Sequence, residues 1–175
     1  MSVLRRALFA FALVLIAGPA IAQEAEEAAT ATAAATHVIL DASEIAWQPA
    51  PAVLPSGAEI AVLAGDLTKE GPFVFRVKIP DGYRVAPHWH PLVESVTVLS
   101  GTFGIGMGET LDPAAGRELG PGALVVLPAE TPHFVWSKGE TIIQVHGSGM
   151  WGLNYVNPED DPRNAAGEGA APQGR

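Results

Sequence analysis

The segment "PHWHPLVESVTVLSG", residues 87–101, contains two histidines one residue apart, a glutamate four residues further on, and then alternating apolar residues. In a helix, side chains two residues apart point to nearly opposite sides, whereas in a strand they share one face, about 6.6 Å apart. Pro87 and Pro91 exclude a helix here. Two imidazoles at this spacing can bind one cation, so His88 and His90 are predicted to be metal ligands.

Glu94 has the same strand parity as the two histidines, provided that the strand continues past Pro91. Its carboxylate would then enter the same interior. Two imidazoles and a carboxylate form a nitrogen and oxygen site that suits a divalent metal. A His-x-His pair in a strand is by itself a weak signal, because ordinary surface histidines also have this spacing. The wider sequence pattern therefore has to decide between the two interpretations.

The histidines and the glutamate belong to a longer string of fixed spacing. Gly82, five residues, His88-x-His90, three residues, Glu94, six residues and Gly101 follow one another. This string resembles the first motif of the cupin superfamily, G-x5-H-x-H-x3-E-x6-G, at every position. The resemblance implies an all-β fold, the antiparallel double-stranded β-helix known as the cupin or jelly-roll barrel.

A second segment, "GALVVLPAETPH" at residues 122–133, resembles the second cupin motif, G-x5-P-x-G-x2-H-x3-N. Glu130 stands where the motif has glycine, and Ser137 where it has asparagine. These departures concern the shape of the loop and not the ligand, His133. The resemblance covers a motif core of residues 73–146. It implies that one divalent metal is bound by three histidines and one glutamate: His88, His90, Glu94 and His133.

Short apolar runs bounded by glycine or proline also indicate an all-β chain. The runs are HVIL, EIAVLAG, FVFRVKIP, ESVTVLSG, GTFGIGM, ALVVLP, HFVWS and TIIQVHG. Residues 73–79 place apolar side chains on one face of a strand and Arg76 and Lys78 on the other. In "GTFGIGMG", residues 101–108, glycine alternates with apolar residues and leaves one strand face almost bare. Such runs joined by tight turns are typical of an antiparallel sandwich or barrel.

The first 22 residues are predicted to be a signal peptide. Arg5 and Arg6 precede an apolar run over residues 7–17, and the small residues Ala20 and Ala22 occupy the cleavage positions. The run is shorter than the roughly 20 residues needed to span a bilayer. We therefore expect cleavage, no membrane attachment afterwards, and a periplasmic or secreted protein. The arginine pair leaves open whether export uses the general or the twin-arginine route.

Three further regions follow the signal peptide. Residues 23–36 are a low-complexity Ala/Thr/Glu leader, which we expect to be flexible because it contains no large apolar side chain. Residues 37–157 are predicted to form the cupin barrel domain. Residues 158–175 are a polar tail, rich in glycine and proline, that we expect to be disordered.

The composition excludes several functional classes. The chain has no cysteine, so it has no disulfide, no thiolate metal ligand and no cysteine nucleophile. After cleavage it would carry eight basic and nineteen acidic residues, a formal net charge of −11. Such an acidic surface argues against nucleic acid and anionic membranes as partners.

The predicted site favours a metalloenzyme that acts on a small organic molecule. Four protein ligands on an octahedral ion leave two positions for substrate and O₂ or water. Redox-active Fe²⁺ or Mn²⁺ would suit a dioxygenase-type oxidoreductase, while Zn²⁺ or Ni²⁺ would act only as a Lewis acid. One alternative is a non-catalytic module that binds a small ligand or metal. Another is a metal-dependent isomerase or lyase with Glu94 as its catalytic base.

Three weaker expectations complete the analysis. A homodimer is expected because "ALVVL", residues 123–127, is apolar on both faces. His146 is a candidate pocket residue, although an ordinary histidine at a strand end is the favoured interpretation. Four apolar residues are candidates to line the barrel, although a role as ordinary core is the favoured interpretation of each: Phe103, Ile105, Met107 and Trp136.

Overall fold

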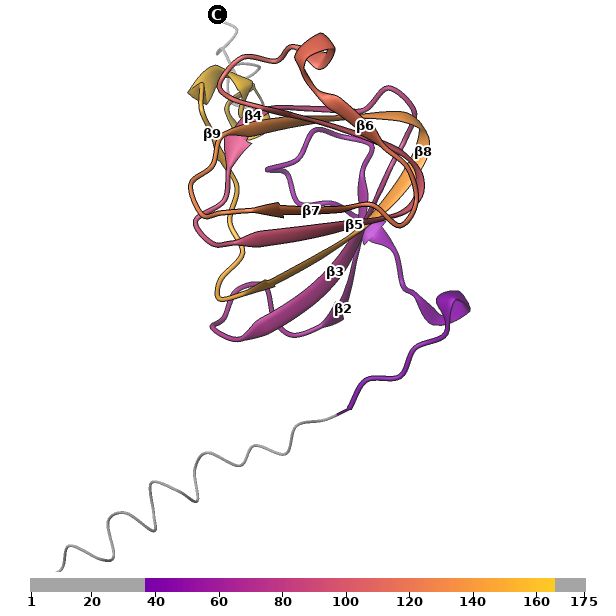
Figure 1. Cartoon of the computed structure of the whole chain (residues 1–175). Coiled ribbons are helices and arrows are strands. Elements are labelled where there is room, and N and C mark those ends of the chain that lie inside the picture. Colours follow the sequence, from indigo (N-terminus) through magenta and orange to yellow (C-terminus); the bar gives the residue numbers. More distant parts are fainter. Residues whose placement is uncertain (1–36, 166–175) are drawn as a thin grey trace, which may run out of the picture. The chain divides into compact units, whose positions relative to one another are not determined.

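The computed structural model describes residues 37–165, and predictions for residues 1–36 lie outside this range (Figure 1). Its strands are β1 (Gln48–Pro49), β2 (Glu59–Ala64), β3 (Pro72–Ile79), β4 (Arg84–Trp89), β5 (Glu94–Met107), β6 (Arg117–Leu119), β7 (Leu124–Leu127), β8 (His133–Ser148) and β9 (Asn154–Tyr155). The helical turns are η1 (Ala42–Glu44), η2 (Pro113–Ala115), η3 (Pro158–Asp160) and α2 (Pro162–Ala165). Within this part of the chain, no helix has the length and apolar character needed to cross a membrane.

All strand pairs are antiparallel, and the nine strands form one curled sheet. The two longest strands, β5 and β8, pair with each other along most of their length. On its other edge, β8 pairs first with β4 and then with β3. On its other edge, β5 pairs first with β7 and then with β6. This arrangement confirms the predicted cupin-type barrel, because two long strands shared by both halves close the sheet on itself.

Gly101 allows the long strand β5 to bend between its two halves. Its backbone φ is +77°, and a Cβ at this position would lie 2.3 Å from the carbonyl oxygen of Glu140. The pairing register with β8 shifts on both sides of Ser100. Only glycine fits such a left-handed, crowded position, which explains why the first motif ends on this residue.

The bare face of β5 is covered by two aromatic rings of β8. A Cβ at Gly104 would lie 2.0 Å from the ring of Trp136, and one at Gly106 would lie 2.1 Å from the ring of Phe134. The two rings stack with their centroids 5.9 Å apart. The alternating glycines predicted from the sequence therefore make room for aromatic side chains on the outer side of the barrel.

Two of the four candidate lining residues face the barrel interior. Phe103 and Ile105 are buried and line the central cavity. Trp136 has the strand parity of an outward-facing position on β8, whereas Met107 shares the parity of Phe103 and Ile105 but is the last residue of β5 and does not line the cavity. Trp136 packs over Gly104, and Met107 is 55% exposed.

The core fills the space that the curled sheet encloses. The predicted alternation along β3 is confirmed, since its apolar positions are buried and its intervening positions are only partly buried. The buried hydrophobic side chains come from six of the strands and from the connecting loops: Ala58, Ile60, Phe73, Phe75, Val77, Ile79, Tyr83, Val85, Val96, Val98, Phe103, Ile105, Leu127, Ile143, Val145 and Leu153.

Two segments at the ends of the described chain differ from expectation. The run at residues 37–40 forms no strand, and Val38, Ile39 and Leu40 are exposed, because no neighbouring strand edge pairs with them. The beginning of the expected tail, residues 158–165, forms the turns η3 and α2. Residues 166–175 lie outside the described range.

Candidate metal centre

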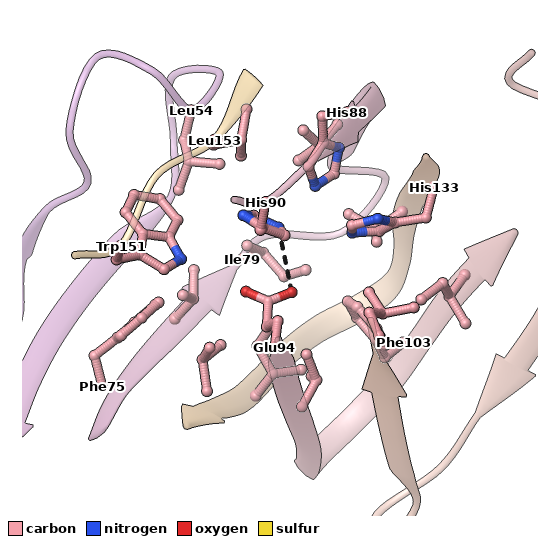
Figure 2. Close-up of a pocket in the computed structure, with 18 of the residues that line it drawn as sticks. Leu54, Phe75, Ile79, His88, His90, Glu94, Phe103, His133, Trp151 and Leu153 are labelled. Carbon is pink, nitrogen blue, oxygen red and sulfur yellow. Dashed lines mark ion pairs between the residues drawn. The ribbon is translucent and has the colours of Figure 1, made fainter. Parts of the chain in front are cut away.

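The four predicted ligands meet inside the barrel, although they come from three different strands or their ends (Figure 2). His88 lies near the end of β4, and His90 follows that strand directly. Glu94 is the first residue of β5, and His133 is the first residue of β8. All four side chains are buried, so the structure brings together every residue of the predicted set.

The three histidines form a compact group of nitrogen donors. One ring nitrogen from each lies within 4.8 Å of the others. The ring centroids of His88 and His133 are 4.2 Å apart, and His90 lies 5.1 Å from His88 and 5.3 Å from His133. The carboxylate Oε2 of Glu94 lies 3.2 Å from Nε2 of His90. Three imidazoles around one point can hold a divalent ion, and the nearby carboxylate supplies an anionic oxygen donor.

Glu94 reaches the site by a route that differs from the predicted one. The strand does not continue past Pro91, since β4 ends at Trp89 and a turn precedes β5. The two strands then lie on opposite edges of β8. The carboxylate therefore enters from across the barrel, and shared strand parity is not the reason that it lies beside the histidines.

Backbone carbonyl groups orient each of the three imidazole rings. The Nδ1 atoms of His88, His90 and His133 lie 2.8, 2.7 and 3.0 Å from the carbonyl oxygens of Ala86, Gly152 and Thr131 respectively. A carbonyl oxygen can only accept a hydrogen bond, so each Nδ1 carries the proton. In the neutral ring, Nε2 then holds the free electron pair, which is the form that binds a metal.

The pKa values of two histidines favour this neutral form. Burial lowers the pKa of His88 well below its ordinary value, and the neighbouring His133 and His90 lower it further. Burial also lowers the pKa of His133, and this effect outweighs the hydrogen bond to Thr131. Both rings are therefore neutral at neutral pH, ready to donate to a cation.

His90 and Glu94 form a buried contact between an imidazole nitrogen and a carboxylate oxygen. Burial lowers the pKa of His90, but its contact with the Glu94 carboxylate has the larger combined effect and raises it. Burial raises the pKa of Glu94, yet the contact with His90 lowers it overall. Without a cation, an unprotonated Nε2 would face a carboxylate at 3.2 Å, which is repulsive. A proton on His90 or a bound divalent ion relieves this repulsion, so the donor set fits a metal.

The site opens onto a small apolar cavity of about 60 Å³. Apart from the four candidate ligands, aliphatic and aromatic side chains form its wall: Leu54, Phe75, Val77, Ile79, Tyr83, Val85, Val96, Phe103, Ile105, Leu127, Val135, Ile143, Val145, Trp151 and Leu153. Tyr83 directs its hydroxyl to the carbonyl oxygen of Pro55. Such a cavity would exclude water from a bound ion and admit only a small molecule.

Several of these wall residues were not recognised from the sequence. Leu54 lies in the loop before β2, while Trp151 and Leu153 lie between β8 and β9. The same segment supplies the Gly152 carbonyl oxygen that orients His90. These residues lie outside both motifs and outside the periodic runs, so no local pattern marked them as part of the site.

The two departures from the second motif have distinct structural outcomes. Glu130 adopts the left-handed conformation that the motif's glycine would take, with a φ of 57°, and its N–H donates to the His90 carbonyl oxygen at 2.8 Å. Ser137 is buried, and its hydroxyl bridges the turn between β3 and β4, donating to Pro80 O at 2.5 Å and accepting from Tyr83 N at 3.0 Å. His133 therefore remains in the site despite both departures.

His146 lies outside the candidate site. Its side chain is exposed on β8, and Nε2 lies 2.9 Å from the side-chain nitrogen of Gln144. It does not line the cavity. The favoured interpretation, an ordinary histidine near a strand end, agrees with this position.

The chain is similar to several solved cupin structures. The polyketide cyclase RemF from Streptomyces resistomycificus matches with a TM-score of 0.58 and 14% identity, over 75% of this chain and 94% of that chain. An RmlC-like cupin from Shewanella frigidimarina matches with a TM-score of 0.52 and 12% identity, over 65% and 92%. The DMSP lyase DddQ from Ruegeria pomeroyi matches with a TM-score of 0.53 and 19% identity, over 70% and 72%.

Identities this low establish the fold and not the activity. No curated protein matches the chain. The family described as "Domain of unknown function (DUF4437)" matches residues 14–154, which is most of the chain. The protein therefore has the cupin fold and belongs to the DUF4437 family.

Proposed function

We propose that this protein is an exported, metal-dependent oxidoreductase of the dioxygenase type that acts on a small organic molecule. His88, His90, Glu94 and His133 would hold one divalent ion, with Fe²⁺ or Mn²⁺ favoured over Zn²⁺ or Ni²⁺. When bound, a redox-active ion would supply the electron-transfer chemistry with O₂ that no side chain provides. The protein's own residues would hold the ion, exclude water and select a substrate by size.

One observation carries this proposal: among the described residues, the cavity offers no base besides the candidate ligands. Its remaining titratable wall residue is Tyr83, whose hydroxyl donates to a backbone carbonyl and whose pKa is raised by burial. Acid–base chemistry needs a group whose pKa lies near the working pH. An apolar wall around a metal-binding donor set suits redox chemistry better than proton transfer.

The alternative of a metal-dependent isomerase or lyase requires Glu94 to act as a base. Its contact with His90 lowers the pKa of this carboxyl overall, despite burial, and a carboxylate with a low pKa is a weak base. Glu94 is therefore better suited to a ligand role. A non-catalytic module that binds a metal or a small ligand remains the alternative that the experiments below distinguish.

Metal content tests the donor set directly. Purified protein should contain up to one divalent ion per chain by elemental analysis. His88→Ala and His133→Ala should each lose most of this metal, because three remaining donors hold a divalent ion less tightly. Glu94→Gln keeps the shape of the side chain but removes its charge, so it should weaken metal binding while leaving folding intact.

His146→Ala is the matched control, since that side chain is exposed. Full occupancy in the His88→Ala/His133→Ala double variant would place the metal elsewhere.

Oxygen consumption tests the reaction class. Protein loaded with Fe²⁺ or Mn²⁺ should take up O₂ in the presence of a small organic substrate found by screening, and Zn²⁺-loaded protein should not. Uptake that is equal with all three metals would contradict redox chemistry at this centre. Tight binding of a small molecule without turnover would instead support the non-catalytic alternative.

Export is a separate proposal that rests on the first 22 residues. Mass spectrometry of protein from the exporting cell should find the mature N-terminus at Gln23, in the periplasmic or secreted fraction. An intact Met1 on protein recovered from the membrane fraction would contradict the cleavage.

We also propose a homodimer in solution. Among the described strands, β7 pairs only with β5, and its outward side chains Leu124 and Val126 are 63% and 56% exposed. A second copy could cover this apolar face. Light scattering should give twice the monomer mass, and Leu124→Lys/Val126→Lys should shift the mass towards the monomer. A wild-type monomer across micromolar concentrations would remove the proposal.

A further inference from the structure

The indole N–H of Trp151 is a hydrogen-bond donor without an acceptor. Among the described residues, its nitrogen is the buried side-chain polar atom for which no hydrogen-bond partner is found. The ring is held in place, edge-on to Phe75 at 5.5 Å and tilted against His90 at 5.8 Å, and its backbone N–H donates to Leu67 O at 2.9 Å. Figure 2 shows the nitrogen directed into the cavity, towards Glu94 and His90.

The carboxylate of Glu94 is the acceptor that lies in this direction, but it does not satisfy the indole. Burial and the contact with His90 are the main influences on the pKa of Glu94, and the indole N–H makes the smallest lowering contribution. The geometry of a hydrogen bond between the two groups is not reached. The electrostatic effect of an N–H extends further than a hydrogen bond, so the indole lowers the pKa of Glu94 slightly without pairing with it. A buried donor without an acceptor is destabilising, so an acceptor that enters the cavity gains by pairing with it.

The rest of the cavity wall selects for an apolar molecule. No lysine, arginine, serine, threonine, asparagine or glutamine lines it among the described residues. The hydroxyl of Tyr83 already donates to Pro55 O. Beyond the metal donors, Trp151 is thus the one wall residue with a free polar group. A ligand can place a single acceptor there, and its remaining surface must be apolar.

The charge of the loaded site favours a monoanion. A divalent ion, one carboxylate from Glu94 and three neutral imidazoles sum to a single positive charge. The apolar wall supplies no other charge. A monoanion neutralises the site, whereas a dianion would leave an uncompensated charge in a medium of low polarity, which is costly.

The size of the cavity limits the ligand to a few non-hydrogen atoms. Its volume is about 60 Å³. An apolar cavity of about 150 Å³ accommodates benzene. A molecule smaller than benzene is therefore the largest ligand that fits without rearrangement of the wall.

We propose that the cavity binds short-chain monocarboxylates, with one carboxylate oxygen accepting a hydrogen bond from the indole N–H of Trp151 and the alkyl chain lying against the apolar wall. This inference rests on the proposed metal site, and it adds the substrate class and a residue that determines specificity.

Isothermal titration of the full chain loaded with Mn²⁺ tests the substrate class. The probes are formate, acetate, propionate, butyrate and benzoate as sodium salts. Affinity should rise about fourfold for each added methylene while the chain still fits, and benzoate should not bind. Propionamide, which is neutral, and malonate, a dianion, should bind at least about tenfold more weakly than propionate.

Trp151→Phe tests the donor, because phenylalanine keeps an aromatic wall and lacks the N–H. Affinity for each carboxylate should fall by about fivefold to tenfold, while the dependence on chain length and the metal content stay unchanged. Trp136→Phe is the matched control, since that ring lies on the outer side of the barrel over Gly104. It should bind carboxylates like the wild type.

The outcomes separate this inference from the proposed function. A wild type that takes up no metal overturns both. Normal metal content with no preference for monocarboxylates, or with equal carboxylate affinity in Trp151→Phe, overturns this inference alone. Loss of metal in Trp151→Phe would also overturn it, because the indole would then be a positioning residue for Glu94.

Discussion

The backbone at Glu130 is held in a left-handed conformation that L-residues other than glycine rarely adopt. Its φ is 57°, and its N–H donates to the carbonyl oxygen of His90, one of the candidate ligands. This conformation costs an L-residue about 1–2 kcal/mol. The structure tolerates this cost because the loop must return to the site at His133.

Glu130→Gly should therefore stabilise the protein. Relief of the conformational cost exceeds the extra chain entropy that glycine loses on folding, about 0.5–1 kcal/mol, so a net gain of about 0.5–1 kcal/mol in the free energy of unfolding is expected. Urea unfolding of the metal-free protein measures it. Glu130→Ala, which removes the side chain but keeps the conformational cost, should show no gain. A less stable Glu130→Gly variant would mean that the glutamate side chain has a stabilising role.

At the scale of elements, β5 and β8 pack closely because Gly104 and Gly106 of β5 leave space for the aromatic rings of Trp136 and Phe134 of β8. Neither strand shows this by itself. A bare strand face on β5 is compatible with exposure to solvent, and the apolar residues of β8 are compatible with a position in the core. Their antiparallel register, Gly104 opposite Trp136 and Gly106 opposite Phe134, makes each the complement of the other.

Gly104→Ala should destabilise the barrel by about 1–3 kcal/mol, because its Cβ would lie 2.0 Å from the Trp136 ring and force the ring to move. The expected readout is a lower midpoint of urea unfolding with an unchanged slope. Gly120→Ala is the control, since no atom lies within 4 Å of a Cβ at that position, and it should be close to neutral. Equal stability of Gly104→Ala and the wild type would show that the aromatic cover is mobile.

At the scale of the whole molecule, the buried site couples folding to pH. In the metal-free protein, the pKa values of His88 and His133 are lowered, mainly by burial. Below about pH 6.5 the unfolded chain binds protons that the folded chain does not, so stability falls as the pH falls. His90 contributes with the opposite sign to the pH dependence of stability. Its pKa is raised, so as the pH falls the folded state binds this proton at a higher pH than the unfolded state does. The stabilisation from His90 is fully present below about pH 6.5 and no longer changes with pH. His88 and His133 therefore determine how steeply the free energy of unfolding falls below that pH.

Between pH 6.5 and 5.5, the free energy of unfolding should fall by up to about 1.4 kcal/mol per pH unit for each of these two histidines. Urea unfolding of chelator-treated protein across this range measures the slope. His88→Asn should give a shallower slope, and His146→Ala should leave it unchanged because that side chain lies outside the buried site. A slope that does not respond to His88→Asn would mean that other groups control acid unfolding.

The sequence by itself determined the barrel and the four candidate ligands. The first motif gives His88, His90 and Glu94 the spacings of the cupin pattern, and the second places His133. Gly101 is also predictable from the sequence, because its left-handed backbone conformation requires glycine and the first motif ends on that glycine. Glu130 and Ser137 depart from the second motif, yet His133 still lies beside His88 and His90.

Tertiary structure alone decided the cavity and its selectivity. Trp151 and Leu54 enter the wall because distant loops pack against the barrel mouth, and nothing in their local sequence specifies that contact. Glu94 faces His90 because β5 begins across the barrel from β4, and the parity argument failed since a turn at Pro91 separates the strands. The alternation of apolar and polar residues along a strand predicts which face of that strand a side chain occupies. Which groups then face each other depends on how the sheet closes, and that closure also determines the buried charges and pKa values.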